Sequence, residues 1–333
     1  MTCANHPDRP AHGHGLCRKC YDGRRRNSTA TVAAAADRIL EIAGPQPPST
    51  FQEAIDSVRF ANPAPFQVSF PTIQPPLDTE IITGVIYGDT HGQYIDEAAE
   101  GVLLSVLKDF QPDVVVHIGD AVDCYTISRF SKDPTRKETL QDEIDHARRH
   151  LARVRLATPN AAMYLFEGNH EERLHRAFCA SQDAMREVVQ LRAFQDAITW
   201  PNLLQLDGLG VNWVPLQDQP AMGIFTKFIL KHGDVVRKWS GWSAAGEWAK
   251  YGKSGASGHV HRLGLFFHRD WNGNHVWAET GCLCDLNPDY TPDPDWQNGF
   301  LVVTFERATG AFQVEPVYIH RGSAVWRGQV FKA

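Results

Sequence analysis

The segment IITGVIYGDTHG, residues 81–92, decides the fold that we predict for this chain. Apolar and β-branched residues run up to Gly88, and two side chains that bind metals well, Asp89 and His91, follow it. This order indicates a strand that delivers ligands from its C-terminal end. Side chains alternate along extended backbone, so Asp89 and His91 can point to one side and bind one ion together. A polar loop after a buried strand is the alternative, because Asp-x-His alone is a short pattern.

The composition is that of an ordinary globular protein of 333 residues, 43% hydrophobic and 22% charged. No stretch approaches the roughly 18 apolar residues of a membrane span, and residues 1–10 lack the apolar core of a signal peptide. The seven cysteines are an odd number, unlike the framework of a secreted disulfide protein, so we expect reduced thiols. We therefore expect a cytoplasmic protein without a membrane partner.

The net charge of -6 is distributed unevenly. Residues 1–26 contain six Arg or Lys and two Asp, which gives +4, whereas the remainder has 27 basic and 37 acidic residues, which gives -10. An acidic body binds nucleic acid poorly without specific contacts. A short basic head is suited to attach such a body to nucleic acid.

Residues 1–26 also carry four side chains at zinc-ligand spacing: Cys3, His6, Cys17 and Cys20. Two-residue spacing lets both members of a pair reach one tetrahedral zinc, and so short a segment needs such a staple to fold. We predict a zinc knuckle, in which His12 or His14 are alternatives to His6; free thiols without zinc are the other interpretation. GLCRKCY followed by arginines resembles the small zinc modules of phage-type nucleases, which implies nucleic-acid contact.

Beyond the head, residues 27–79 are rich in Ala and then Pro, which predicts a linker or strap. The body, residues 80–333, alternates helix and strand patterns. Helices are expected over 95–110 and 135–156, and strands over 114–118 and 163–166. The later apolar runs are expected to form antiparallel strands that close a second sheet: 263–268, 275–279, 300–305 and 312–319.

Five segments of the body each place Asp, Asn or His where an apolar run ends. The residues concerned are Asp89, His91, Asp120, Asn169, His232, His259 and His261. In α/β sheets ligands bind at the carboxyl ends of strands, so we expect these seven side chains to share one crevice. Their oxygen and nitrogen donors suit two divalent ions.

These motifs, Asp89-x-His91, GDAVD at 119–123, GNHE at 168–171, His232 and GHVH at 258–261, resemble the ordered signature of the calcineurin-like metallophosphoesterase superfamily, including phage and prophage members. The resemblance implies an α/β four-layer sandwich of two mixed β-sheets with helices outside. It also implies two metal ions with Asp120 as a shared ligand. The ligands of the first ion would be Asp89, His91 and His261, and those of the second Asn169, His232 and His259. His170 is implied to face the substrate, and Arg173 is a candidate clamp for a phosphate oxygen. Asp123 is expected either to orient His170 or a metal ligand, or to cap a helix or turn.

Two cations about 3.5–4 Å apart lower the pKa of a bridging water, and the resulting hydroxide attacks phosphorus in line. His170 is suited either to protonate the leaving oxygen or to hold a transition-state oxygen. The mixed donors favour manganese or iron, and zinc is possible.

The leading hypothesis is a phosphoesterase that hydrolyses phosphodiester bonds in nucleotides or nucleic acid. The alternatives are a phosphomonoesterase acting on a phosphoprotein or small metabolite, and a non-catalytic nucleic-acid-binding factor. Other polar and aromatic residues have simpler interpretations: Cys282 and Cys284 are expected to be structural thiols, and His117 a core residue. Trp239 and Trp242 are candidates either for base stacking or for packing.

Overall fold

The computed structural model describes residues 2–3, 6–10 and 79–333, apart from residues 133, 182, 220–222, 225–227 and 289–292. The chain divides into two compact units, Met1–Gly44 and Pro45–Ala333. In the first unit, β1 (Thr2–Cys3) and β2 (His6–Pro10) pair antiparallel, with Cys3 opposite His6. Cys17, Cys20 and most of the predicted strap (27–78) lie outside the described residues, so the zinc knuckle and the strap stay predictions.

The first sheet of the body has six strands in the order β13-β12-β3-β4-β5-β6. They are β3 (Ile81–Tyr87), β4 (Val114–His117), β5 (Ala162–Phe166), β6 (Val211–Val214), β12 (Gly299–Glu306) and β13 (Phe312–Tyr318). β3 to β6 run parallel, whereas β12 runs antiparallel to β3 and β13 antiparallel to β12. The sheet is therefore mixed.

The expectation that the strands near 300–305 and 312–319 close the second sheet was wrong. β12 pairs with β3, where Leu301 lies opposite Ile86, and so it extends the first sheet. This pairing covers the backbone groups of β3, which would otherwise form an exposed edge. Alternation of apolar residues predicts which face of a strand is buried, but it does not predict the neighbouring strand.

The second sheet has five strands in the order β10-β11-β9-β8-β7. They are β7 (Gly223–Ile224), β8 (Phe228–Lys231), β9 (Ser254–Ser257), β10 (Leu263–Asp270) and β11 (Gly273–Thr280). β8, β9 and β11 run parallel, and the two edge strands run antiparallel to their neighbours. This sheet is mixed as well.

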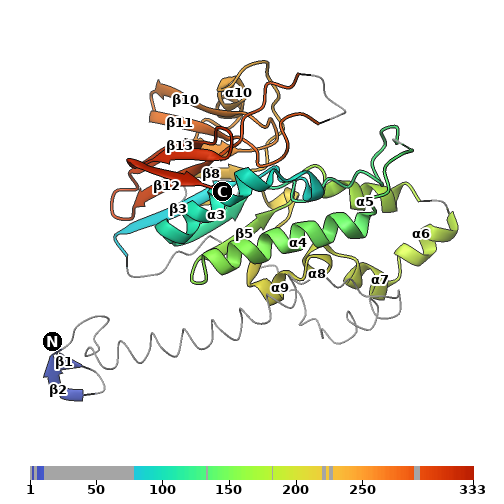
Figure 1. Ribbon diagram of the computed structural model, residues 1–333, viewed down its shortest axis with the longest axis horizontal. Coiled ribbons are helices and arrows are strands. Elements are labelled where there is room, and N and C mark those ends of the chain that lie inside the picture. Colours follow the sequence, from blue (N-terminus) through green and yellow to red (C-terminus); the bar gives the residue numbers. More distant parts are fainter. Residues whose placement is uncertain are drawn as a thin grey trace. The chain divides into compact units, whose positions relative to one another are not determined.

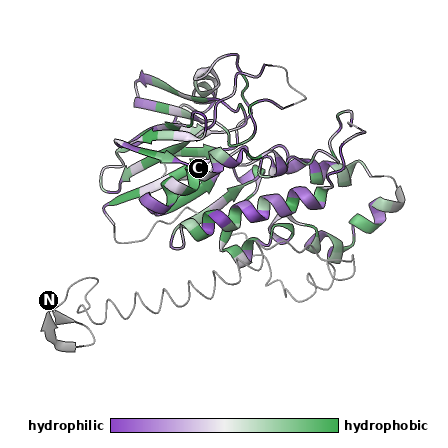
Figure 2. Ribbon diagram, in the orientation of Figure 1, coloured by the Kyte–Doolittle hydropathy of each residue, from purple (hydrophilic) through white to green (hydrophobic). Residues whose placement is uncertain are grey.

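The two sheets pack face to face over one hydrophobic core (Figures 1 and 2). Ile86 and Phe166 of the first sheet and Phe228 and Leu230 of the second are fully buried there. The rings of Phe228 and Phe305 meet edge to face, 5.4 Å between centroids. Burial of these side chains against one another holds the layers together.

Helices cover the outer faces of both sheets. α3 (Glu97–Phe110) and α4 (Leu140–Ala157) lie on the first sheet, where the Tyr87 hydroxyl contacts His150 Nε2 at 3.1 Å. α10 (Trp242–Tyr251) lies on the second, where Tyr251 stacks on Trp277. The prediction of two mixed sheets with helices outside is confirmed.

α4 begins at Leu140 and not near residue 135 as expected. Thr139 is its N-cap, and Thr139 and Asp142 form a reciprocal capping box. A proline at 134 cannot lie inside a helix without breaking it, so the chain stays irregular until this cap. The delayed start leaves a long loop between β4 and α4.

The remaining elements are short. The helices are α5 (Glu172–Cys179), α6 (Asp183–Val189), α7 (Arg192–Ala197), α8 (Trp200–Leu203) and α9 (Leu206–Leu209), with 3-10 turns at Gly92–Tyr94 and Leu216–Asp218. A hairpin of β14 (Ser323–Trp326) and β15 (Gln329–Lys332) packs on α3, where Trp326 meets Phe110 edge to face. Within the described residues, no helix combines the length and apolar character needed to cross a bilayer.

Candidate metal centre

The predicted ligands come together at the C-terminal ends of the strands that precede them. The first sheet supplies four of them and the second sheet three: Asp89, His91, Asp120 and Asn169, then His232, His259 and His261. Hydrogen bonds join the loops directly, because the backbone N–H groups of Asp89 and His91 donate to the carbonyls of Gly119 and Asp120, each at 3.0 Å. These bonds hold the loops after β3 and β4 side by side.

Five of these residues adopt left-handed backbone. Their φ values are 53° at Asp89, 51° at His91, 56° at Asp120, 71° at His259 and 57° at His261. Such φ values are uncommon outside glycine and cost on the order of 1 kcal/mol or more each, so the surrounding structure must enforce them. Clustering of this strain at one place is typical of a functional site.

One half of the centre joins β3 to the loop after β9. His261 Nε2 lies 3.2 Å from Asp89 Oδ1 and 3.0 Å from His91 Nε2. The Asp89 carboxylate is buried and also accepts the backbone N–H of His259 at 3.1 Å. Burial alone would raise the pKa of Asp89, but the charge and hydrogen bond of His261 outweigh it and lower that pKa.

The other half is built around the amide oxygen of Asn169. It lies 2.7 Å from His259 Nδ1 and 3.0 Å from His232 Nε2. His232 Nδ1 lies 3.1 Å from the carbonyl of Ile118, which orients the ring. Burial lowers the pKa of His259 to about 4, and the neighbouring His232 adds to this effect.

Asp120 stands between the two halves. Its Oδ2 lies 3.3 Å from His232 Nε2 and 3.9 Å from His91 Nε2, while its Oδ1 accepts the backbone N–H of His170 at 3.0 Å. Burial works to raise the pKa of Asp120, but the charges of His170 and His232 hold it well below its usual range. The pKa of His232 is raised to about 9. Burial works against this rise, and the charge of Asp120 causes it.

The donors suit divalent metal ions. Three groups of donor atoms each lie within 4.8 Å of one another: His91, Asp120 and His170; Asp120, His232 and His259; and His91, His261 and Cys284. Where two imidazole nitrogens face each other, as in His91 and His261, a proton or a cation must lie between their lone pairs. Imidazole, carboxylate and amide donors together fit divalent transition metals, so the residues present fit the ions that the site implies.

Glu171 holds the centre together, although sequence reasoning gave it no role. Its buried carboxylate accepts the backbone N–H groups of Gly168, Asp120, Ala121 and Val122 at 2.7, 3.0, 2.7 and 3.1 Å. These bonds fasten the loop after β4 to the loop after β5. Burial and the nearby Asp120 charge raise the pKa of Glu171 to about 7. The sequence signal that could have identified Glu171 was its position at the end of the GNHE motif, next to His170.

Three further buried glutamates hold neighbouring loops in the same way. Glu143 accepts the N–H groups of Cys124 and Tyr125, Glu247 those of Asp234 and Val235, and Glu279 those of Gly241 and Ala244. Glu143 lies on the buried stripe of α4, in register with residues 147, 150 and 154. A charged residue on an apolar stripe is the sequence signal that could have identified it.

His170 lies at the edge of the centre, and 15% of its side chain is exposed. Its Nδ1 lies 2.8 Å from the carbonyl of Asp123 and 3.0 Å from Asp123 Oδ1, and its Nε2 lies 3.7 Å from Asp120 Oδ2. Burial would lower the pKa of His170, but Asp120 and Asp123 outweigh it and raise that pKa. Asp123 also lies 3.3 Å from His91 Nδ1, so it contacts both histidines.

Arg173 also reaches this edge. Its Nη1 donates to the Asp123 carbonyl at 2.7 Å, and its Nη2 lies 3.0 Å from His170 Nε2. The structure thus brings together the three residues that the sequence proposed for catalysis.

Cys284 and His117 lie just behind the ligands. Cys284 Sγ is 3.7 Å from His261 Nδ1, the ring nitrogen turned away from Asp89, so this thiol contacts a predicted ligand as well as packing. Cys282 is buried. His117 Nε2 contacts Thr90 Oγ1 at 3.0 Å in the core and is not among the converging donors.

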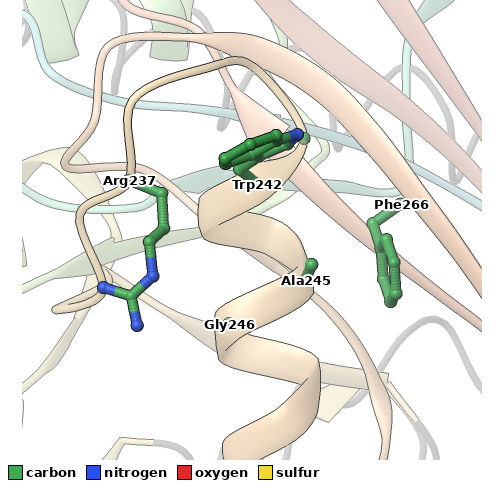
Figure 3. A pocket seen from close by; sticks show the side chains of 6 residues that line it. Arg237, Trp242, Ala245, Gly246 and Phe266 are labelled. Atoms are coloured by element: carbon green, nitrogen blue, oxygen red, sulfur yellow. The ribbon is translucent and has the colours of Figure 1, made fainter.

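A separate cavity of about 420 Å³ lies at the start of α10. Figure 3 shows Arg237 and Phe266 on opposite sides of this helix, with Trp242 at its first turn. Trp242 is 53% exposed and meets the half-exposed Trp239 edge to face. None of the converging ligands lines this cavity, so it is not the candidate metal centre.

Comparisons with known proteins identify the family of the chain. The family model described as calcineurin-like phosphoesterase matches residues 84–293, which include all seven converging residues. The gene 54 protein of Mycobacterium phage L5 is 30% identical over 233 residues, covering 67% of this chain and 88% of that protein, and its counterpart in phage D29 is 28% identical over 234 residues, with the same coverage. Vacuolar Protein Sorting 29 from Cryptosporidium parvum matches with a TM-score of 0.39 and 16% identity, covering 77% of this chain and 100% of that chain.

The match extends over more than half of the chain. It confirms the resemblance inferred from the motifs, including the resemblance to phage proteins. The chain belongs to the calcineurin-like phosphoesterase family and is a metal-dependent hydrolase of phosphate esters.

Proposed function

We propose that this enzyme hydrolyses phosphodiester bonds in nucleotides or nucleic acid with two divalent ions, manganese or iron in preference to zinc. Each ion has its own ligand set, and Asp120 is shared between them: Asp89, His91 and His261, then Asn169, His232 and His259. The position of Asp120 supports this proposal most directly, because one carboxylate oxygen lies within 3.9 Å of a histidine from each set.

The chemistry that a pair of such ions supplies is a water of lowered pKa and neutralised charge on the phosphoryl oxygens. Only Asp89 and Asp120 among the seven ligands are carboxylates, and two carboxylates cannot neutralise two divalent cations. The remaining positive charge favours binding of a phosphate group. Glu171 supports this arrangement, because it keeps Asp120 in the position that both sets require.

His170 is proposed to protonate the leaving oxygen. Asp123 engages its Nδ1, so Nε2 is the nitrogen that would carry the proton toward the leaving oxygen, once the Arg173 guanidinium beside it has turned to the phosphoryl group. Arg173 lies beside that nitrogen and is proposed to bind a phosphoryl oxygen through its guanidinium. Its second bond, to the Asp123 carbonyl, orients the guanidinium group.

Rates on bis-p-nitrophenyl phosphate and on p-nitrophenyl phosphate with manganese test the bond that is cleaved. A diesterase prefers the first compound. A strong preference for the monoester would replace this proposal by a phosphomonoesterase that acts on a phosphoprotein or a small metabolite. Turnover of neither compound, by protein that retains its metals, would contradict both.

A further inference from the structure

The loop between β4 and α4 differs in charge from the rest of the body. Residues 125–137 contain four basic residues and one acidic residue, which gives +3, whereas residues 27–333 together carry -10. Arg129, Phe130 and Lys132 are all exposed. Figure 1 shows this loop projecting next to α5, the helix that carries Arg173. A local excess of positive charge at the edge of a phosphoesterase centre is suited to a polyanionic substrate.

The base of the loop is firmly held. Glu143 accepts the backbone N–H groups of Cys124 and Tyr125, and the Arg136 guanidinium lies 4.3 Å from the centroid of the Tyr125 ring and 4.9 Å from that of Tyr94. Lys132 Nζ donates to the carbonyls of Tyr125 and Ser128, so it crosses the loop. These contacts give the loop a defined shape before any substrate binds.

Phe130 stands at the tip with 61% of its surface exposed. Guanidinium groups approach its ring from two residues: the central carbon of Arg129 lies 5.7 Å from the ring centroid and that of Arg173 lies 5.9 Å away. Arg173 is the residue whose Nη2 contacts His170 Nε2 at 3.0 Å. The ring is therefore only one arginine side chain away from the proposed general acid.

The exposed Phe130 ring and the positive charges of Arg129 and Lys132 together indicate the kind of ligand that this loop would bind. Within the described part of the chain, Arg129 has no carboxylate partner, and Lys132 donates only to carbonyl and hydroxyl oxygens. An apolar protein partner would cover the ring but bury these cations without compensation, which is costly. A nucleotide satisfies both needs, because its base stacks on an aromatic face and its phosphate pairs with Arg or Lys.

We infer that Phe130 and Arg129 form a binding subsite for the nucleoside on the leaving-group side of the scissile phosphate. The base stacks on the Phe130 ring, and Arg129 contacts a phosphate or the base edge. Because His170 gives its proton to the leaving oxygen, the group next to this histidine is the one that departs. This inference rests on the proposed function. It adds that the leaving group is a nucleoside and that Phe130 recognises its base.

The test combines protein and substrate variants. The manganese-loaded enzyme and its Phe130→Ala variant are assayed on a thymidine dinucleotide and on two analogues, each lacking one base. Removal of the leaving-side base is expected to lower kcat/KM by roughly 5- to 150-fold in the wild type but not in Phe130→Ala. Product analysis identifies which nucleoside leaves, and Phe130→Trp should retain the dependence on its base.

Phe267→Ala is the matched control, since Phe267 is 71% exposed but lies on β10. It should leave the dependence on either base unchanged. An equal loss from base removal in the wild type and in Phe130→Ala would overturn the subsite, and so would a dinucleotide that resists an enzyme active on bis-p-nitrophenyl phosphate. In the first case the proposed function would survive whole; in the second its phosphodiesterase activity would survive, but a dinucleotide would be excluded as substrate. An enzyme inactive on every diester would instead refute that proposal, and the subsite with it.

Discussion

The ligand cluster and the 125–137 loop are linked through Arg173, which contacts both His170 and Phe130, yet they are built in opposite ways. Five of the seven ligands in the cluster are buried, five have strained backbone, and carboxylates that accept backbone N–H groups fasten the loops that carry them. The loop is largely exposed and cationic, and it is held by Glu143 and Arg136 at its base and by Lys132, which crosses it. Metal ligands must stay within a few tenths of an ångström of one geometry, whereas a substrate must be able to enter and leave.

A buried glutamate holds the backbone in each of these two regions. Glu171 fixes Asp120 inside the cluster, and Glu143 fixes the first residues of the loop. Both carboxyl groups have a pKa raised to about 7, mainly by burial. A carboxylate that accepts several N–H groups makes a rigid joint, but its burial makes that joint sensitive to pH.

The largest effect is expected from Asp120→Ala, which removes the carboxylate placed between the two ligand sets. Both ions should be lost, and turnover should fall to background, because neither set is complete without the shared ligand. Metal content by mass spectrometry and kcat on bis-p-nitrophenyl phosphate measure the two losses. Asp109→Ala, at an exposed position on α3, is the control. Retained metals and activity in the Asp120 variant would show that Asp120 is not the shared ligand.

A smaller effect is expected from His170→Ala, at the boundary between cluster and loop. The metals should stay, and kcat should fall by about 10²–10⁴-fold, the usual contribution of general acid catalysis. The same two measurements apply, with His146→Ala on the surface of α4 as control. Because His170 also lies in a possible ligand group with His91 and Asp120, loss of metal in this variant would assign it to the cluster.

The smallest effect concerns Glu143, which fastens the loop. Burial, assisted by the Asp123 charge, raises the pKa of this carboxyl from 4.5 to about 7. Between these values the native protein holds a proton that the unfolded chain has lost. Stability should therefore fall as pH rises from about 4.5 to about 7 and change no further above it, by up to about 3 kcal/mol.

Urea denaturation of the metal-free protein at several pH values measures this slope. Glu143→Gln cannot titrate at this position, so its slope should be shallower than that of the wild type. Glu138→Gln, an exposed residue just before α4, should keep the wild-type slope. Parallel slopes for all three proteins would show that Glu143 has an ordinary pKa.

Much of the centre was predictable from the sequence because its ligands follow strands. Asp89 and Asn169, for example, come two residues after the end of β3 and three after the end of β5, and apolar runs mark such strands well. The ordered motifs then indicated the family. The pairing of strands was less predictable. The strand β12 was assigned to the wrong sheet, because a strand pattern contains no information about the neighbouring strand.

Other features depend on contacts between distant residues. Glu143 and Cys124 are 19 residues apart, and Cys284 reaches His261 across 23 residues. The expectation of a structural thiol at Cys284 rested on its local sequence, in which His261 does not appear. Contacts of this kind arise only when loops from separate strands are brought side by side.

The sequence by itself determined which chemical groups are available and at which strand ends they stand, since local patterns of apolar and polar residues encode strands and turns. Tertiary structure alone decided how those groups are used: which nitrogen of each histidine faces the centre, and which glutamates clamp the loops. It also decided that the guanidinium groups of Arg129 and Arg173 approach the Phe130 ring. The reason is physical, because distance and burial set hydrogen bonds and pKa values, and both quantities exist only after the chain has packed.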